Sequence, residues 1–118
     1  MADKVQTNLT CDWEIAPREV AKMLADGEEF VLIDCRTPEE HETARIDGAM
    51  LVPLQELSVR IGELRQYEDQ LIVVHCHKGA RSMSMTAVLR ELGFERVRSM
   101  SGGIHRWSEE VDPRVPKY

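Results

Sequence analysis

The stretch Leu71–Ser82, LIVVHCHKGARS, decides the expected fold of this chain. Its first half, Leu71 to His75, is a run of aliphatic and β-branched residues, which is typical of a strand buried inside a parallel sheet. Helical periodicity starts at Ser82, since apolar residues follow at the spacing of one helix face: Met85, Val88, Leu89 and Leu92. Cys76 is therefore expected at a turn between a strand and a helix.

This position gives Cys76 the surroundings of a reactive thiolate. The unpaired N–H groups and partial positive charge of a helix N-terminus favour the thiolate, as do the nearby cations of Lys78 and Arg81. Gly79 permits the backbone angles of a tight loop. The whole segment can then form a concave anion site of inward-pointing amides. Its residues are Cys76, His77, Lys78, Gly79, Ala80 and Arg81.

A cysteine beneath an anion site supports two chemistries. Attack on phosphorus gives a thiophosphate intermediate, whereas attack on sulfane sulfur gives a persulfide. The loop pattern is CxxxxR, with four residues between Cys76 and Arg81. The residues of the loop by themselves leave both reactions open.

Composition limits the other function classes. The chain has 118 residues, 42% of them hydrophobic and 31% charged, and a net charge of −6, which disfavours nucleic acid and anionic membrane surfaces as partners. No apolar run approaches the roughly 20 residues of a membrane span. The start, MADKVQTNLT, lacks the pattern of a signal peptide, so we expect a cytoplasmic protein. Three cysteines without CxxC spacing favour one reactive thiol over a disulfide scaffold or a metal site.

Strand and helix patterns alternate along the rest of the chain. Strands are expected at 13–15, 30–34, 50–52 and 97–100, and helices at 17–27, 38–44, 54–64 and from 103. Thr37 and Glu40 form a capping-box pattern. This alternation predicts an α/β fold with a small, mainly parallel sheet and helices on both faces. We expect a flexible tail over 1–10, one domain over 11–111 and an extended tail over 112–118.

Several segments together resemble rhodanese-like sulfurtransferases. The CxxxxR loop has the length of that family's active-site loop, while the related phosphatases and arsenate reductases have CxxxxxR, a wider cradle. VLIDCR at Val31–Arg36 and RIDGAMLVP at Arg45–Pro53 are similar to the family's strand signatures. Gly93–Trp107 is similar to its glycine-rich closing segment. The resemblance covers nearly all of Trp13–Trp107, and the ending is similar to rhodanese domains joined to adenylyltransferases.

The resemblance implies a rhodanese-like fold and a two-step sulfur transfer. Cys76 takes sulfane sulfur from thiosulfate or a persulfide donor and passes it to cyanide or a thiol, with no metal or organic cofactor. The loop residues His77, Lys78, Gly79, Ala80 and Arg81 bind the donor anion. A persulfide relay to a sulfur carrier protein is the alternative. Further alternatives are a phosphatase, an arsenate reductase and a non-enzymatic interaction module.

Other polar residues near the loop have structural interpretations. Asp34 and Arg36 are expected to support neighbouring loops. Arg81 is expected either to pair with a carboxylate, such as Asp34 or a Glu, or to bind an anion. His75 is expected to be a hydrogen-bonded structural histidine. Cys35, at the end of a strand, is expected to be a buried apolar residue, with resolution of a persulfide as its alternative role.

Overall fold

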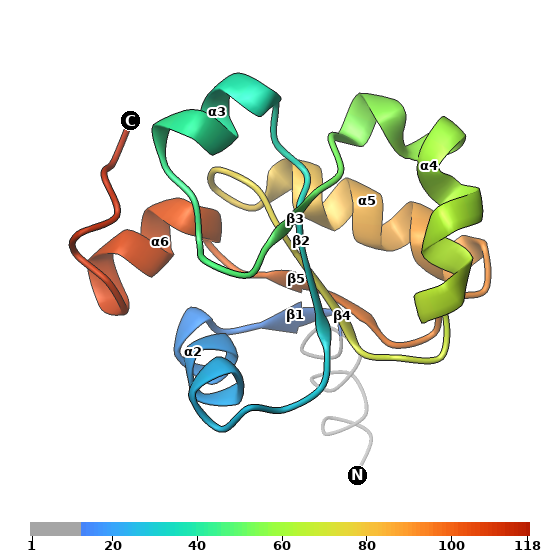
Figure 1. Ribbon diagram of the computed structural model, residues 1–118, viewed down its shortest axis with the longest axis horizontal. Coiled ribbons are helices and arrows are strands. Elements are labelled where there is room, and N and C mark those ends of the chain that lie inside the picture. The colour runs from blue at the N-terminus through green and yellow to red at the C-terminus, as the bar shows by residue number, and fades with distance from the viewer. Residues whose placement is uncertain (1–12) are drawn as a thin grey trace, which may run out of the picture.

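A five-stranded parallel sheet organises the chain. The computed structural model describes residues 13–118; the predicted tail over 1–10 and Cys11 lie outside them. The strand order is β1-β5-β4-β2-β3, and all four pairs of neighbours are parallel. The strands are β1 (Glu14–Ile15), β2 (Val31–Asp34), β3 (Met50–Leu51), β4 (Ile72–His75) and β5 (Val97–Met100). The predicted α/β class with a mainly parallel sheet is confirmed (Figure 1).

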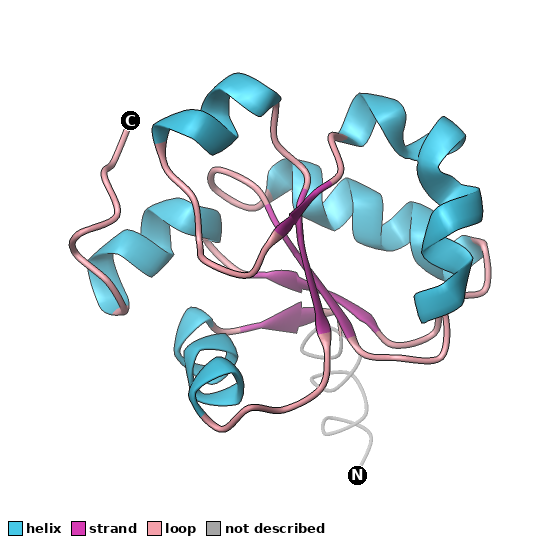
Figure 2. Cartoon of the chain, viewed as in Figure 1, coloured by secondary structure: helices cyan, strands magenta, loops and turns pink. Residues whose placement is uncertain are grey.

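Helices cover both faces of this sheet (Figures 1 and 2). On one face α2 (Pro17–Ala25) and α6 (Gly103–Glu110) contribute Val20 and Trp107 to a core cluster. On the other face α4 (Leu57–Leu64) and α5 (Ala80–Glu91) contribute Leu64 and Leu89 to a second cluster. The short α3 (Pro38–Thr43) buries none of its residues. No helix in the described part of the chain is long and apolar enough to cross a membrane.

The two strands that carry the candidate site are the most completely buried. All four residues of β2 and all four of β4 are buried. Their side chains alternate between the two core clusters: Ile33 and Val74 face one, while Leu32 and Val73 face the other. Burial of each aliphatic side chain stabilises the fold by about 1.5–3 kcal/mol, which fixes these strands and their register.

The observed helices differ from the expected ones at two places. Helix α5 begins at Ala80, two residues before the predicted start, because Gly79 adopts a left-handed conformation with φ +119° and turns the chain directly into the helix. Arg81 therefore lies in the first helical turn. The predicted helix over 54–64 divides into a 3₁₀ turn (Leu54–Glu56) and α4; a second 3₁₀ turn (Arg65–Tyr67) follows.

The last seven residues return to the domain instead of extending away from it. Asp112 accepts a hydrogen bond from the backbone N–H of Arg114 and begins a turn that Val115 closes. Ser108 on α6 donates to the carbonyl of Val115 over 2.6 Å. These contacts direct the C-terminal residue Tyr118 toward α3.

Candidate active site

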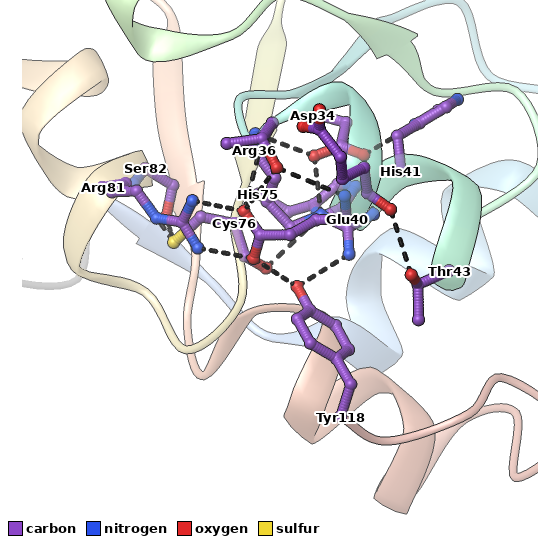
Figure 3. A network of polar contacts seen from close by, with 12 residues as sticks. Asp34, Arg36, Glu40, His41, Thr43, His75, Cys76, Arg81, Ser82 and Tyr118 are labelled. Carbon is purple, nitrogen blue, oxygen red and sulfur yellow. Dashed lines mark hydrogen bonds and ion pairs between the residues drawn. The ribbon is translucent and has the colours of Figure 1, made fainter.

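The candidate site lies at the carboxyl edge of the sheet, where β2 and β4 end side by side. Asp34 pairs with His75 in the parallel register. The segments after these two residues therefore meet: Cys35 and Arg36 follow β2, while Cys76 and its loop follow β4. Figure 3 shows that α3 and Tyr118 reach the same place. Cys76 is 1% exposed and forms the floor of the site.

Hydrogen-bond donors surround the Cys76 sulfur. The backbone N–H groups of Gly79 and Ser82 donate to Sγ over 3.1 Å and 3.3 Å. The Ser82 hydroxyl lies 3.4 Å from Sγ and 2.7 Å from the buried hydroxyl of Ser99 on β5. The same hydroxyl also lies 3.1 Å from the carbonyl oxygen of Gly79. When Cys76 is a thiolate, Ser82 donates to the sulfur, because a charged acceptor forms the stronger bond, and accepts from Ser99. The loop and the first turn of α5 thus form a cradle around a sulfur anion.

These donors lower the pKa of Cys76 to about 4, far below its ordinary value of 9.0. The largest cause is a hydrogen bond from the Cys35 thiol, followed by the side chain and backbone of Ser82 and the backbone of Gly79; burial opposes them. The same contact and burial raise the pKa of Cys35, which stays protonated. Cys76 is therefore a thiolate at neutral pH.

The lowered pKa links stability to pH. Because the folded pKa of Cys76 lies below the unfolded one, the thiolate stabilises the fold fully above about pH 9 and loses this contribution as the pH falls toward about 4. Nucleophilic reactivity behaves differently, because it depends on the folded pKa alone. It is expected to stay constant at neutral pH and to fall only in acid.

Replacement of Ser82 by alanine is expected to raise the pKa of Cys76. Ser82→Ala keeps the backbone N–H but removes the hydroxyl donor, so we expect an increase of about one to two pH units. The pH titration of thiolate ultraviolet absorbance measures this change. Ser84→Ala, an exposed serine on the same helix, is the control and should leave the midpoint unchanged. An unchanged midpoint in Ser82→Ala would contradict the role of its hydroxyl.

Helix α6 holds the loop from below. The backbone N–H groups of Ile104 and His105 donate to the carbonyls of Cys76 and His77 over 2.9 Å and 3.0 Å. This close approach requires a glycine at Gly103, which has φ +60°. A Cβ there would lie 2.6 Å from the Cys76 carbonyl oxygen and would also collide with that of His77. The Gly-Gly turn is therefore part of the loop support.

Arg81 forms a bidentate ion pair with Glu40 of α3. Its two terminal nitrogens lie 2.7 Å and 2.9 Å from the two carboxylate oxygens. The pair lowers the pKa of Glu40 and raises that of Arg81. Of the two expected roles of Arg81, the structure contains the pairing with a carboxylate, which is that of Glu40 and not that of Asp34. Glu40 also completes the predicted capping box with Thr37, which is confirmed.

Asp34 and Arg36 form a fully buried ion pair beneath the site. The guanidinium Nε and Nη2 lie 2.8 Å and 2.7 Å from the two oxygens of Asp34, and both side chains are 0% exposed. Burial opposes ionisation, yet the bonds from Arg36 and His41 lower the pKa of Asp34. Arg36 also donates to the carbonyl of Ala44. The pair ties the segment after β2 to α3 and to the chain that follows it.

Tyr118 lies over the loop. Its ring stacks on the imidazole of His77, with centroids 4.0 Å apart and planes inclined by 12°. Its hydroxyl accepts from Arg36 over 2.8 Å and donates to Glu40 over 2.7 Å (Figure 3). Burial, together with the bond to Glu40, raises the pKa of Tyr118 to about 12 although Arg36 opposes it. The phenol is therefore neutral at physiological pH.

The remaining loop residues differ in exposure. Lys78 and Ala80 are exposed, and Gly79 is half-buried at the N-terminus of α5. His75 is fully buried, and burial lowers its pKa. It is hydrogen-bonded through one ring nitrogen: Nδ1 lies 3.4 Å from the carbonyl oxygen of Cys76, while Nε2 has no hydrogen-bond partner among the described residues. Within residues 13–118, no cluster of three or more His, Cys, Asp or Glu side chains could hold a metal ion.

Three contributors to the site were missed in the sequence. Ser99 is a small polar residue within the predicted strand over 97–100, which was the one indication of its role; the structure buries it to 1% exposure. Glu40 was assigned only a cap, because nothing local indicates that Arg81, 41 residues later, lies opposite it. Tyr118 left no signal, because its position depends on how the C-terminal turn packs against α6.

Comparisons with known proteins agree with this geometry. The family described as Rhodanese-like domain matches residues 16–110. The chain is 34% identical over 102 residues to a Sulfurtransferase of Allochromatium vinosum, covering 86% of this chain and 94% of that one. It is 33% identical over 104 residues to the Probable adenylyltransferase/sulfurtransferase MoeZ of Mycobacterium tuberculosis, covering 88% of this chain but only 26% of that protein. This chain thus spans about a quarter of that relative's length.

A solved structure gives the same result. The Human Single Domain Sulfurtransferase TSTD1 superposes with a TM-score of 0.73 at 25% identity, covering 83% of this chain and 96% of that one. The similarity therefore extends over nearly the whole of a protein that consists of this one domain.

Proposed function

This chain belongs to the rhodanese-like domain family, and from that premise we propose that it is a sulfurtransferase in which Cys76 carries the sulfur. The observation that supports this proposal most is the cradle around Sγ, in which Gly79 and Ser82 donate backbone hydrogen bonds to the sulfur. Such donors stabilise both the resting thiolate and the negative charge of a bound persulfide.

The reaction has two balanced steps. The Cys76 thiolate attacks the outer sulfur of thiosulfate; a sulfur–sulfur bond forms at Sγ, and sulfite leaves with the electron pair of the broken bond. The acceptor, cyanide or a thiol, then attacks the outer sulfur of the persulfide. Cyanide yields thiocyanate and restores the Cys76 thiolate. Neither step requires a metal or an organic cofactor.

The loop provides the attraction for an anionic donor. Lys78 is exposed at the mouth and adds a positive charge to the cradle in a chain of net charge −6. His77 is kept neutral, because burial and neighbouring Lys78 lower its pKa. The Arg81 guanidinium is paired with Glu40. Arg81 must therefore leave this carboxylate before it can bind the donor anion.

Release of Arg81 from Glu40 is therefore expected to strengthen donor binding. Glu40→Gln removes the competing charge but keeps a residue that completes the capping box. We expect the KM for thiosulfate to fall by about threefold to tenfold while kcat changes little. Steady-state kinetics measures both constants. Glu39→Gln removes an equal charge from an exposed neighbour and is the control. A higher KM in Glu40→Gln would mean that Glu40 orients Arg81 on the donor.

The same chemistry supports a relay between proteins. A persulfide donor protein would load Cys76, and a sulfur carrier protein would receive the sulfur. The similarity to MoeZ, whose name combines adenylyltransferase and sulfurtransferase, favours this use. It predicts faster turnover with protein partners than with thiosulfate. A cytoplasmic location suits either use, because thiols stay reduced there.

Phosphate chemistry is less well supported by the same site. A tetrahedral phosphoryl group presents three charged oxygens that need matching donors. In this chain the loop has only four residues between Cys76 and Arg81, so it offers fewer backbone donors to a phosphoryl group held at Sγ than a longer loop would. Aryl-phosphate hydrolysis dependent on Cys76 would reverse this preference.

Mass spectrometry tests the proposed function. Treatment with thiosulfate is expected to add about 32 Da, one sulfur atom, to the peptide that contains Cys76, and cyanide is expected to remove it. Loss of the adduct should coincide with formation of one thiocyanate per chain. A Cys76 that remains unmodified with thiosulfate, inorganic polysulfide and persulfide donors would refute the proposal.

A further inference from the structure

Cys35 is a second thiol placed directly beside Cys76. Because Asp34 pairs with His75 in the parallel register, the next residues, Cys35 and Cys76, also lie opposite each other. The backbone N–H of Cys35 donates to the carbonyl of His75 over 3.0 Å, which extends the pairing past the ends of the strands. Neighbouring strands lie roughly 4.8 Å apart, a separation within the Cα range of disulfides.

The two side chains point to the same face of the sheet. Both belong to the core cluster that contains Ile33 and Val74, the residues two positions earlier on each strand. Cys35 is 0% exposed, and both cysteines are free thiols. The Cys35 thiol is the largest cause of the lowered pKa of Cys76. A buried thiol therefore lies beside the sulfur that the proposed function loads.

We propose that Cys35 discharges the Cys76 persulfide as hydrogen sulfide when no acceptor is present. The inference rests on the proposed function, since it requires a persulfide at Cys76. The Cys35 sulfur attacks Sγ of Cys76, so the Cys35–Cys76 disulfide forms while the bond from Sγ to the outer sulfur breaks. The outer sulfur leaves as HS⁻ with the proton of Cys35. The sulfane sulfur is reduced and the two thiols are oxidised, so no external oxidant is required.

The geometry selects attack on Sγ instead of on the outer sulfur. Gly79 and Ser82 direct their N–H groups at Sγ from the loop, so a persulfide extends toward those donors and the mouth. Cys35 lies beside Cys76 at the end of the neighbouring strand, so Sγ is the sulfur nearest to it. The pKa of Cys35 is raised by Cys76 and by burial, which makes the attack slow. An acceptor that arrives promptly therefore still receives the sulfur.

Discharge leaves a disulfide that blocks the nucleophile. A dithiol reductant must reduce the Cys35–Cys76 bond before Cys76 can accept sulfur again. The site would thus convert surplus sulfane sulfur to sulfide and then stop until it is reduced. This is an activity of sulfide release, distinct from transfer to cyanide or a thiol.

The test follows one loaded chain over time. The full chain in a Cys11→Ser background, which leaves only the two thiols of the site, is loaded with inorganic polysulfide and freed of excess reagent. It is then kept without oxygen and without an acceptor. Sulfide release, intact mass and non-reducing peptide maps are recorded. Loading is confirmed first by the gain of about 32 Da.

The expected result is one sulfide per chain and a final mass about 2 Da below that of the reduced chain, with Cys35 and Cys76 in one linked peptide. Cys35→Ser and Cys35→Val, a polar and an apolar replacement of similar size, should keep the adduct and release sulfide at least about tenfold more slowly. Equal release from these variants, a stable adduct in the chain with Cys35, or the adduct on the Cys35 peptide would each overturn the inference. Failure of every chain to load would instead refute the proposed function, and this inference with it.

Discussion

Cys76→Ser is expected to abolish thiocyanate formation from thiosulfate and cyanide. A serine hydroxyl at this position remains protonated at neutral pH and is a poor nucleophile toward sulfur, so turnover should fall by at least about 10³-fold. The +32 Da adduct should disappear as well, since that mass is one sulfur atom held by the thiolate. A continuous assay of thiocyanate measures the loss.

The fold should survive this change, which separates chemistry from structure. The serine oxygen can accept the same N–H bonds from Gly79 and Ser82 that the sulfur accepts. Ser84→Ala on the exposed side of α5 should retain full turnover under the same conditions. Turnover that persists in a folded Cys76→Ser chain would mean that another thiol, Cys35 or Cys11, carries the sulfur.

Gly103→Ala is expected to have the second largest effect on stability and turnover, although Gly103 is not one of the residues that donate to the Cys76 sulfur. The new Cβ would come within 2.6 Å of the Cys76 carbonyl oxygen, so the loop and α6 must separate. Separation breaks the bonds from Ile104 and His105 that hold the loop carbonyls. We expect a loss of about 3 kcal/mol or more in the free energy of unfolding. Turnover should fall by about 10²-fold, because a nucleophile displaced by an ångström loses that much rate.

Gly27→Ala is the matched control. Gly27 has a similar φ of +69°, but a Cβ there would meet no atom within 4 Å. It should lose only the backbone cost of about 1–2 kcal/mol and keep its turnover. Chemical denaturation and the thiocyanate assay measure the two quantities. Equal effects of both substitutions would mean that Gly103 matters for its φ alone and not for its contact with the loop.

Much of the fold was predictable because its signals are local. The apolar runs at Val31–Asp34 and Ile72–His75 indicated interior strands, and both are fully buried. The Thr37 and Glu40 spacing indicated a capped helix, and the cap is present. The predicted start of α5, Ser82, is two residues too late. Hydrophobic periodicity does not reveal the first two residues of this helix, Ala80 and Arg81, because neither is buried in the core.

The candidate site was predictable only where its residues are neighbours in sequence. The six residues from Cys76 to Arg81 form one loop, and the chemistry of a cysteine at a helix N-terminus follows from their order. The donors beyond the loop come from other elements: Ser99 from β5, and Cys35 from the end of β2. Their contribution depends on strand order, which a single sequence does not contain.

The sequence by itself determined that LIVVHCHKGARS places one cysteine at a strand-to-helix turn within an α/β chain. The tertiary structure decided what surrounds that cysteine. The order β1-β5-β4-β2-β3 sets Cys35 beside it, and the packing of α3 and the C-terminal turn directs Glu40 and Tyr118 to the mouth. The physical reason is that helix and strand signals act over a few residues, whereas a site at a sheet edge is assembled by pairing and packing between distant segments.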